Sequence, residues 1–189
     1  SSLVSPYELN GDLLLMESRN SVRNITAHLL EKGRTLPGFM GDIGYAQSNR
    51  ERYEGFCQAL ADAGKKVDSS LCLTTPLGID TYREEIDTFL SSLSRMPDAF
   101  VCASDYVACI LMQLLEKRGL RVPEDVAVSG FDNNTEDLLA EHLTTVQVFN
   151  EELGARLALQ ILYRIKYPNT PHEITYLGTN VLYRDSTGD

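Results

Sequence analysis

The hydrophobic positions of this chain alternate between short continuous apolar runs and longer stretches in which apolar residues recur every three or four positions. The short runs predict strands at residues 13–16, 38–41, 70–73, 99–103, 126–128, 144–148 and 174–182, the last interrupted near Gly178. The longer stretches predict helices at residues 20–32, 105–118 and 150–166, with two more after Ser48 and Asp80. Strands that alternate with amphipathic helices are typical of βαβ units. The pattern therefore predicts an α/β fold with an open parallel sheet sandwiched by helices.

Flanking residues predict where three of these helices begin or end. Ser48 and Glu51 stand three positions apart, which is the spacing of a capping box. We expect Asp80 to cap the helix that follows it. Gly119 is expected just beyond the helix of residues 105–118, where glycine is favoured.

Charge then narrows the range of partners. The 189 residues carry a formal net charge of −10 and have a pI near 4.8. A chain this acidic, without a basic stripe, is poorly suited to bind DNA, RNA or an anionic membrane by itself. No apolar run approaches the roughly 20 residues that a membrane-spanning helix needs. We therefore expect no membrane partner and no direct nucleic-acid contact from this part of the protein.

The cysteines and the N-terminus indicate a compartment. The four cysteines lie within apolar runs and show no CxxC or paired spacing, which is typical of buried free thiols in a reducing environment. The first residues include no Met and show no basic or apolar signal-peptide region. We expect a cytoplasmic protein of which this chain is one piece.

Polar side chains follow the expected strands. Glu17 comes directly after the first strand, and Arg50 and Arg52 lie in the helix after the second. Ser104 follows the strand of residues 99–103, and Asp132 follows the strand near residue 128. In open parallel sheets the carboxyl ends of the strands form the ligand-binding crevice. We expect these five side chains to face one crevice suited to a polar small molecule.

Some polar residues near the expected crevice also fit a purely local structural role, and this alternative stays open. Asp105 fits the N-cap of its helix, and Asp132 fits an Asx turn at the end of a strand. Arg50 and Arg52 fit surface ion pairs with acidic neighbours on their helix. However, a cation in the first turns of a helix opposes the helix dipole by roughly 0.3–1 kcal/mol. A residue that breaks a local rule beside a predicted crevice is a candidate for function.

No catalytic or metal-binding pattern stands out. The three histidines are widely separated, and HExxH, GxSxG and GKS/T are absent. Gly38, Gly41 and Gly44 give GxxGxxG rather than the dinucleotide-binding fingerprint. We therefore expect no catalytic residues, no metal and no cofactor, and expect that the chain is not an enzyme.

Several segments occur together in an order that resembles one family. They are RERYEGF at residues 50–56, FVCASD at residues 100–105, RGLRVPEDV at residues 118–126, VSGFDN at residues 128–133, LTTV at residues 143–146 and RDSTG at residues 184–188. Together they resemble the effector-binding region of LacI/GalR-type bacterial transcriptional regulators. The resemblance extends over essentially the whole chain.

The resemblance implies a fold like that of periplasmic sugar-binding proteins, with two α/β subdomains and a ligand between them. By motif position, Arg52 matches the arginine that grips the effector, and Asp132 matches the acidic residue of the Gly-aromatic-Asp motif. Ser104 stands where Asn is frequent, Glu17 stands where Asp is common, and Val148 replaces a frequent polar residue. These departures leave the effector open between a sugar, a sugar phosphate and a nucleobase.

The resemblance also implies an assembly and a division of the chain. Such regulators are homodimers that bind operator DNA through an N-terminal helix-turn-helix, which this chain lacks. We expect residues 1–16 and 149–176 to belong to the N-terminal effector subdomain, and residues 18–148 and 177–189 to the C-terminal one. The apolar stripe Leu153, Leu157, Ile161 and Ile165 would then lack part of its partner surface and favour self-association.

Two other classes of protein stay open at this point. A periplasmic-type sugar-binding protein would have the same architecture, although unpaired cysteines and the absence of a visible signal peptide argue against it. A small α/β enzyme that uses the same crevice is the third alternative, and no motif favours it.

Overall fold

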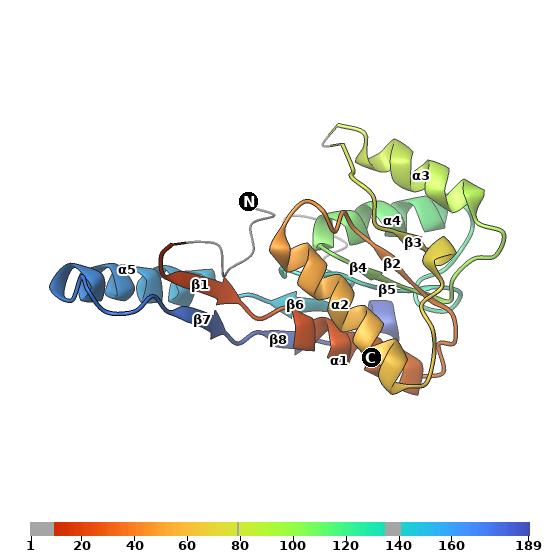
Figure 1. The fold of residues 1–189 in the computed structure, drawn as a ribbon. Coiled ribbons are helices and arrows are strands. Elements are labelled where there is room, and N and C mark those ends of the chain that lie inside the picture. The colour runs from red at the N-terminus through yellow and green to blue at the C-terminus, as the bar shows by residue number, and fades with distance from the viewer. Residues whose placement is uncertain (1–9, 79, 135–140) are drawn as a thin grey trace.

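The computed structural model describes residues 10–78, 80–134 and 141–189. Its centre is a parallel sheet with the strand order β3-β2-β4-β5 (Figure 1). These strands are β2 (Pro37–Met40), β3 (Cys72–Leu73), β4 (Ala99–Cys102) and β5 (Ala127–Ser129). A 3₁₀ helix, η2 (Ser69–Leu71), leads into β3. Strands β2, β4 and β5 are buried throughout, as their apolar runs predicted. The strand predicted at residues 70–73 is wrong over its first half, where the chain forms η2, and β3 is half-buried.

Helices cover both faces of this sheet. They are α1 (Arg19–Glu31), α2 (Gln47–Asp62), α3 (Tyr82–Ser92) and α4 (Asp105–Lys117). Successive residues of β4 point to opposite faces, as the two-residue period of a strand requires. Val101 packs with Ile25 of α1 and Phe56 of α2, whereas Phe100 packs with Leu111 of α4 on the other face. The sheet is thus sandwiched between α1 and α2 on one side and α3 and α4 on the other.

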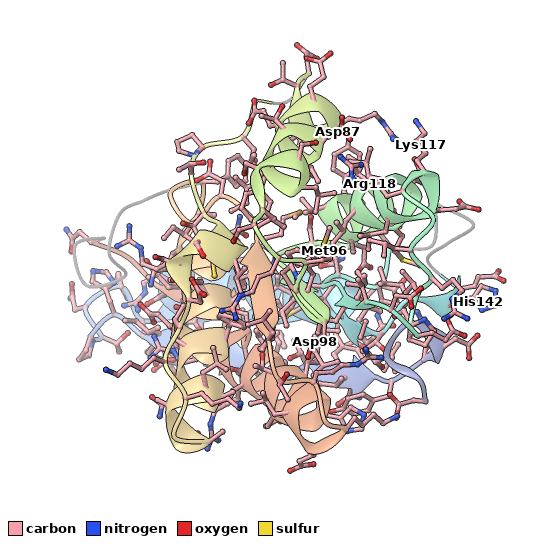
Figure 2. The ribbon with its side chains drawn as sticks, turned by 90° about the vertical axis from the view of Figure 1, so that its right-hand side faces the viewer. Asp87, Met96, Asp98, Lys117, Arg118 and His142 are labelled. Carbon is pink, nitrogen blue, oxygen red and sulfur yellow. The ribbon has the colours of Figure 1, made fainter. Side chains whose placement is uncertain are left out.

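An ion pair joins the two helices of the second face. Arg118 follows α4 directly, and its guanidinium lies 2.8 Å from the carboxylate of Asp87 in α3 (Figure 2). The same guanidinium donates to the hydroxyl of Ser91, one turn further along α3. Gly119 follows with a φ of +74°, which confirms its predicted place just beyond the helix.

The last part of the chain returns to the edge of the sheet. Strand β6 (Thr145–Gln147) lies beside the end of β5 through a parallel bridge between Ser129 and Thr144, and it pairs in antiparallel fashion with β8 (Asn180–Leu182). A final 3₁₀ helix, η4 (Asp185–Thr187), is buried against β5 by its last two side chains. The C-terminal residues are therefore part of the same core as the central sheet.

A smaller unit projects from this body (Figure 1). Strand β1 (Leu13–Met16) pairs in parallel with β7 (Ile174–Leu177), and α5 (Asn150–Lys166) packs beside β1. No residue of α5 is buried, and Leu162 and Ile165 expose 63% and 73% of their surface. The apolar pattern of α5 thus has no complete partner surface among the residues that the structure describes.

Three predicted helix caps are wrong. Helix α2 begins at Gln47, before Ser48, and no side chain caps it, so Ser48 and Glu51 form no capping box. Helix α3 begins at Tyr82, with Thr81 rather than Asp80 in the capping position. The hydroxyl of Ser104, not the carboxylate of Asp105, caps α4 by accepting a bond from the Val107 amide. A cap depends on where the incoming chain turns, and tertiary contacts set that turn.

None of the helices in the described ranges is long and apolar enough to cross a membrane.

Candidate functional site

Two adjoining cavities meet at the start of α2, the first between this helix and β1 and the second where the loops after β2, β4 and β5 converge. The first has a volume of about 270 Å³ and is lined in part by Leu14, Met16 and Glu51. The second has a volume of about 240 Å³ and is lined in part by Asp42, Tyr45, Tyr82 and Ser104. Ser48, Arg52 and Asp132 line both cavities. The carboxyl ends of the strands therefore form the predicted crevice, with Arg52 and Asp132 at its centre.

Arg52 is held at the floor of the crevice. It is only 9% exposed, and its guanidinium carbon lies 3.6 Å from the centre of the Phe131 ring. One terminal nitrogen donates to the carbonyl of Ala103, and the other lies 3.4 Å from Oδ1 of Asp132. Within the described residues, its Nε atom has no hydrogen-bond partner. Burial lowers the pKa of Arg52, whereas the nearby carboxylates of Asp132, Asp105 and Glu51 raise it.

Asp132 projects from a backbone with unusual geometry. Its φ is +109° and that of Asn133 is +50°, a region that L-residues rarely adopt. Its side chain is 43% exposed, so the carboxylate reaches both Arg52 and the crevice. Burial raises the pKa of Asp132, and the positive charge of Arg52 opposes this change. Backbone geometry of this kind persists only where the surroundings hold it, and it often marks a functional site.

Ser104 and its neighbour Asp105 connect the site to the core. Ser104 lines the second cavity and uses its hydroxyl to cap α4. Asp105 is buried, and its carboxylate accepts bonds from the hydroxyl of Thr145 at 2.6 Å and the amide of Asn134 at 2.7 Å. Burial raises the pKa of Asp105 to about 6, and the negative charge of Asp132 adds to this effect. Asp105 therefore supports the loop that carries Asp132.

Glu17 and Arg50 line neither cavity. The carboxylate of Glu17 accepts hydrogen bonds from the amides of Asn20 and Ser21, so it satisfies the first turn of α1. Arg50 is exposed on α2. The structure thus brings three of the five expected residues together, and ligand roles for Glu17 and Arg50 stay predictions.

The surface-pair alternative is wrong for Arg52. Its ion-pair partner is Asp132, eighty positions away, rather than an acidic neighbour on α2. Glu54, one of those neighbours, pairs instead with Arg19 of α1. Arg52 therefore turns from its helix into the crevice, whereas Arg50, which lies in the first turn of α2, is exposed.

Sequence reasoning missed part of the second cavity. Asp42 is buried, accepts a 2.7 Å bond from the amide of Gly44, and shares the cavity wall with Tyr45. Tyr45 is 61% exposed, and Tyr82 packs edge-on against Tyr106 with ring centres 5.6 Å apart. The length of the loop that follows β2 is the feature of the sequence that could have indicated Asp42 and Tyr45 as cavity residues. Tyr82 stands at the start of α3, and no sequence signal predicts its place in the cavity wall.

The chemistry of the crevice suits a hydroxyl-rich ligand. Carboxylates accept bonds from hydroxyl groups, the guanidinium donates, and exposed aromatic rings offer apolar faces for stacking. Among the described residues, no group of three or more His, Cys, Asp or Glu side chains is placed to hold a metal ion. The arrangement is that of a binding site with a few directed polar groups.

Comparison with known proteins agrees with this geometry. The family described as the periplasmic binding protein-like domain matches residues 26–187. The chain belongs to this family. This identification confirms the predicted α/β fold of the periplasmic binding protein type.

The relatives of this family member are transcriptional regulators, in agreement with the LacI/GalR resemblance. DegA of Bacillus subtilis, an HTH-type transcriptional regulator, is 32% identical over 146 residues, which are 76% of this chain and 42% of DegA. The PurR repressor of Photobacterium profundum is 28% identical over 87% of this chain and 49% of its own length. The chain spans about half the length of these curated relatives.

Two solved structures show the same fold. A transcriptional regulator CelR in complex with cellobiose matches 97% of this chain and 56% of its own, with a TM-score of 0.85 and 28% identity. A LacI-family regulator from Sanguibacter keddieii matches 94% of this chain and 67% of its own, with a TM-score of 0.82 and 28% identity. These relatives and solved structures are all named as transcriptional regulators.

Proposed function

We propose that this chain is the effector-binding part of a LacI-family transcriptional regulator and holds a sugar or sugar derivative against Arg52. The observation that carries the proposal is the buried guanidinium of Arg52, which faces Asp132 and whose Nε atom bonds to nothing within the described residues. A buried donor without a partner costs free energy. A ligand oxygen that reached Nε would recover that cost and stabilise the buried cation.

Charge in the crevice favours a neutral ligand over a phosphorylated one. Arg52 lines both cavities, but Asp42, Glu51 and Asp132 bring carboxylates to the same walls. A phosphate group would meet more negative than positive charge at short range. Hydroxyl groups instead donate to carboxylates without such repulsion. The complex of a related regulator with cellobiose supports this choice of ligand class.

The proposed ligand lies between two parts of the protein. We assign residues 1–16 and 149–176 to an N-terminal subdomain, and residues 18–148 and 177–189 to a C-terminal one; residues 1–9 lie outside the described residues. The separate β1–β7 pair and the exposed apolar side chains of α5 support this division. The first cavity supports it too, since Leu14 and Asn150 line it from one side and Arg52 lines it from the other.

Assembly and DNA binding follow from the same proposal. A longer protein of this family would bind operator DNA as a homodimer through an N-terminal helix-turn-helix, as the resemblance implies. The chain's net charge of −10 is compatible with a sensor whose DNA contacts lie elsewhere. The names of the HTH-type relatives support this arrangement.

A ligand panel tests the proposal on the full-length regulator. Thermal shift would be measured with glucose, cellobiose, ribose, glucose 6-phosphate and hypoxanthine, because a ligand that binds the folded state raises Tm. We expect a neutral sugar to raise Tm and glucose 6-phosphate to have no effect. A response to hypoxanthine or glucose 6-phosphate alone would contradict the ligand class, and no response to any compound would contradict the sugar-binding function.

Two variants locate the binding within the crevice. Arg52→Met and Asp132→Asn should each abolish the response to the sugar. Arg121→Met is the matched control, because Arg121 forms a surface pair with Asp125 and lines neither cavity. An unchanged response in Arg52→Met would place the ligand elsewhere.

A further inference from the structure

The backbone of the loop that carries Asp132 is held by three successive hydrogen bonds. The amide of Asp132 donates to the carbonyl of Val146 at 3.1 Å. The amide of Asn133 donates to the hydroxyl of Thr145 at 3.2 Å, and that of Asn134 donates to the Asp105 carboxylate at 2.7 Å. Three successive amides are thus bonded to two elements, the first two to β6 and the third to the first residue of α4. These bonds fix a backbone whose φ values are unfavourable for L-residues.

The side chain of Asn133 bridges two further elements. Its amide nitrogen donates to the side-chain oxygen of Gln147 in β6 at 2.5 Å. Its side-chain oxygen accepts a 2.9 Å bond from the guanidinium of Arg184, which comes just before η4. The left-handed conformation of Asn133 directs its side chain between these two partners, one on each side.

Arg184 is itself anchored to the core. The same guanidinium donates to the carbonyl of Leu143 at 3.0 Å, and the Arg184 amide donates to the Thr144 hydroxyl at 2.7 Å. Next to it, the buried hydroxyl of Ser186 donates to the carbonyl of Val128 in β5 and accepts from the Thr144 amide. The C-terminal segment is therefore tied to the strands on both sides of the Asp132 loop.

We propose that Arg184 and Asn133 are positioning residues that hold the Asp132 carboxylate against Arg52, so that the C-terminal segment sets the geometry of the crevice. The inference rests on the proposed function, in which Asp132 binds the ligand. Arg184 and Asn133 line neither cavity, so their action on a ligand passes through Asp132.

Nuclear magnetic resonance of the ligand-free chain tests this bridge. The reporters are the Arg52 Nε–Hε signal and the carboxyl carbon signal of Asp132, because the two side chains lie 3.4 Å apart. Asn133→Gly removes both side-chain bonds, and glycine adopts a φ of +50° without steric cost. We expect both signals to shift or broaden in Asn133→Gly and in Arg184→Met.

Controls separate positioning from a structural role. Arg184→Lys, which keeps a donor near Asn133, should bring the signals back towards their wild-type positions, and Arg121→Met should leave them unchanged. If Arg184→Met fails to fold, the spectra of Asn133→Gly alone test the inference. This variant keeps the bond from Arg184 to the Leu143 carbonyl, so the C-terminal segment stays anchored. Unchanged reporter signals in folded Asn133→Gly would overturn the inference.

Ligand binding by the full-length regulator gives an independent readout. With cellobiose as the probe, Asn133→Gly should weaken binding at least fivefold while its Tm stays near that of the wild type. Wild-type affinity in Asn133→Gly would overturn the inference. A failure of the wild type to bind any sugar would instead count against the proposed function, and the ligand-free spectra would still test the bridge.

Discussion

The hydroxyl of Thr145 donates a 2.6 Å hydrogen bond to the carboxylate of Asp105, and both side chains are buried beneath the loop that carries Asp132. The burial of Asp105 couples the stability of the fold to pH, because it raises the pKa of this carboxyl from 3.8 to about 6 although the bond from Thr145 acts to lower it. Asp105 therefore holds its proton more tightly in the folded chain than in the unfolded one.

A pH-dependent stability follows from this shift. A group whose pKa is raised by folding stabilises the fold below its unfolded-state pKa, and the contribution is lost as the pH rises through the folded-state value. We expect the free energy of unfolding to fall between about pH 4 and pH 6, by up to about 3 kcal/mol from Asp105. Urea denaturation across this range measures the effect.

The matched variant for this prediction is Asp105→Asn, which cannot titrate. Its free energy of unfolding should change less with pH than that of the wild type. Asp132, whose pKa is also raised, contributes in the same direction, so Asp132→Asn serves as the second comparison. Equal pH dependence in wild type and Asp105→Asn would contradict the assignment to Asp105.

Close packing of α1 on α2 predicts a contrast between two helical glycines. A Cβ at Gly55 in α2 would lie 2.2 Å from the carbonyl oxygen of Arg19, whereas one at Gly154 in α5 would meet nothing within 4 Å. Gly55→Ala should destabilise the fold by about 1–3 kcal/mol through overpacking. Gly154→Ala should stabilise it by about 0.5–1 kcal/mol, because alanine favours the helix. Thermal or urea denaturation measures the change in stability of both variants. Equal changes in Gly55→Ala and Gly154→Ala would contradict the packing argument.

The sequence predicted the framework of this fold because burial leaves a periodic pattern. Strand β1 and helix α5 have the bounds that their apolar residues predicted, and β4 ends within one residue of its prediction. Arg52 and Asp132 were placed together because strand ends converge in a parallel sheet, although eighty positions separate them. Periodicity thus predicts most of the elements, and topology predicts that Arg52 and Asp132 lie together.

The remaining features depend on contacts that a linear pattern does not record. Glu17 follows a strand like the other site residues, but its carboxylate turns to the amides of α1. Tyr45 and Asp42 lie in a loop whose path is set by bonds such as that from Asn49 to the Asp42 carbonyl. Loop conformation and helix caps therefore had to come from the structure.

The exposed ring of Tyr45 predicts a specific effect on ligand binding. If the ligand stacks on this ring in the second cavity, Tyr45→Ala should weaken cellobiose binding to the full-length regulator by about 0.5–1.5 kcal/mol. Stability should change little, because the side chain is mostly exposed. Calorimetry measures the affinity, with Arg121→Met as the control, since Arg121 forms a surface pair with Asp125 and lines neither cavity. Equal affinities of Tyr45→Ala and wild type would exclude stacking.

The exposed apolar side chains of α5 predict self-association of this chain. Contiguous apolar surface of this kind favours protein contacts in water, and Leu162 and Ile165 are its most exposed members. We expect the average mass in sedimentation equilibrium to rise with concentration. The double variant Leu162→Lys/Ile165→Lys should remain monomeric, because two ammonium groups resist burial in an apolar contact. Tyr45→Lys, which removes an exposed apolar side chain of the main body, should associate like the wild type. A wild-type chain that is monomeric at every concentration would contradict the role assigned to α5.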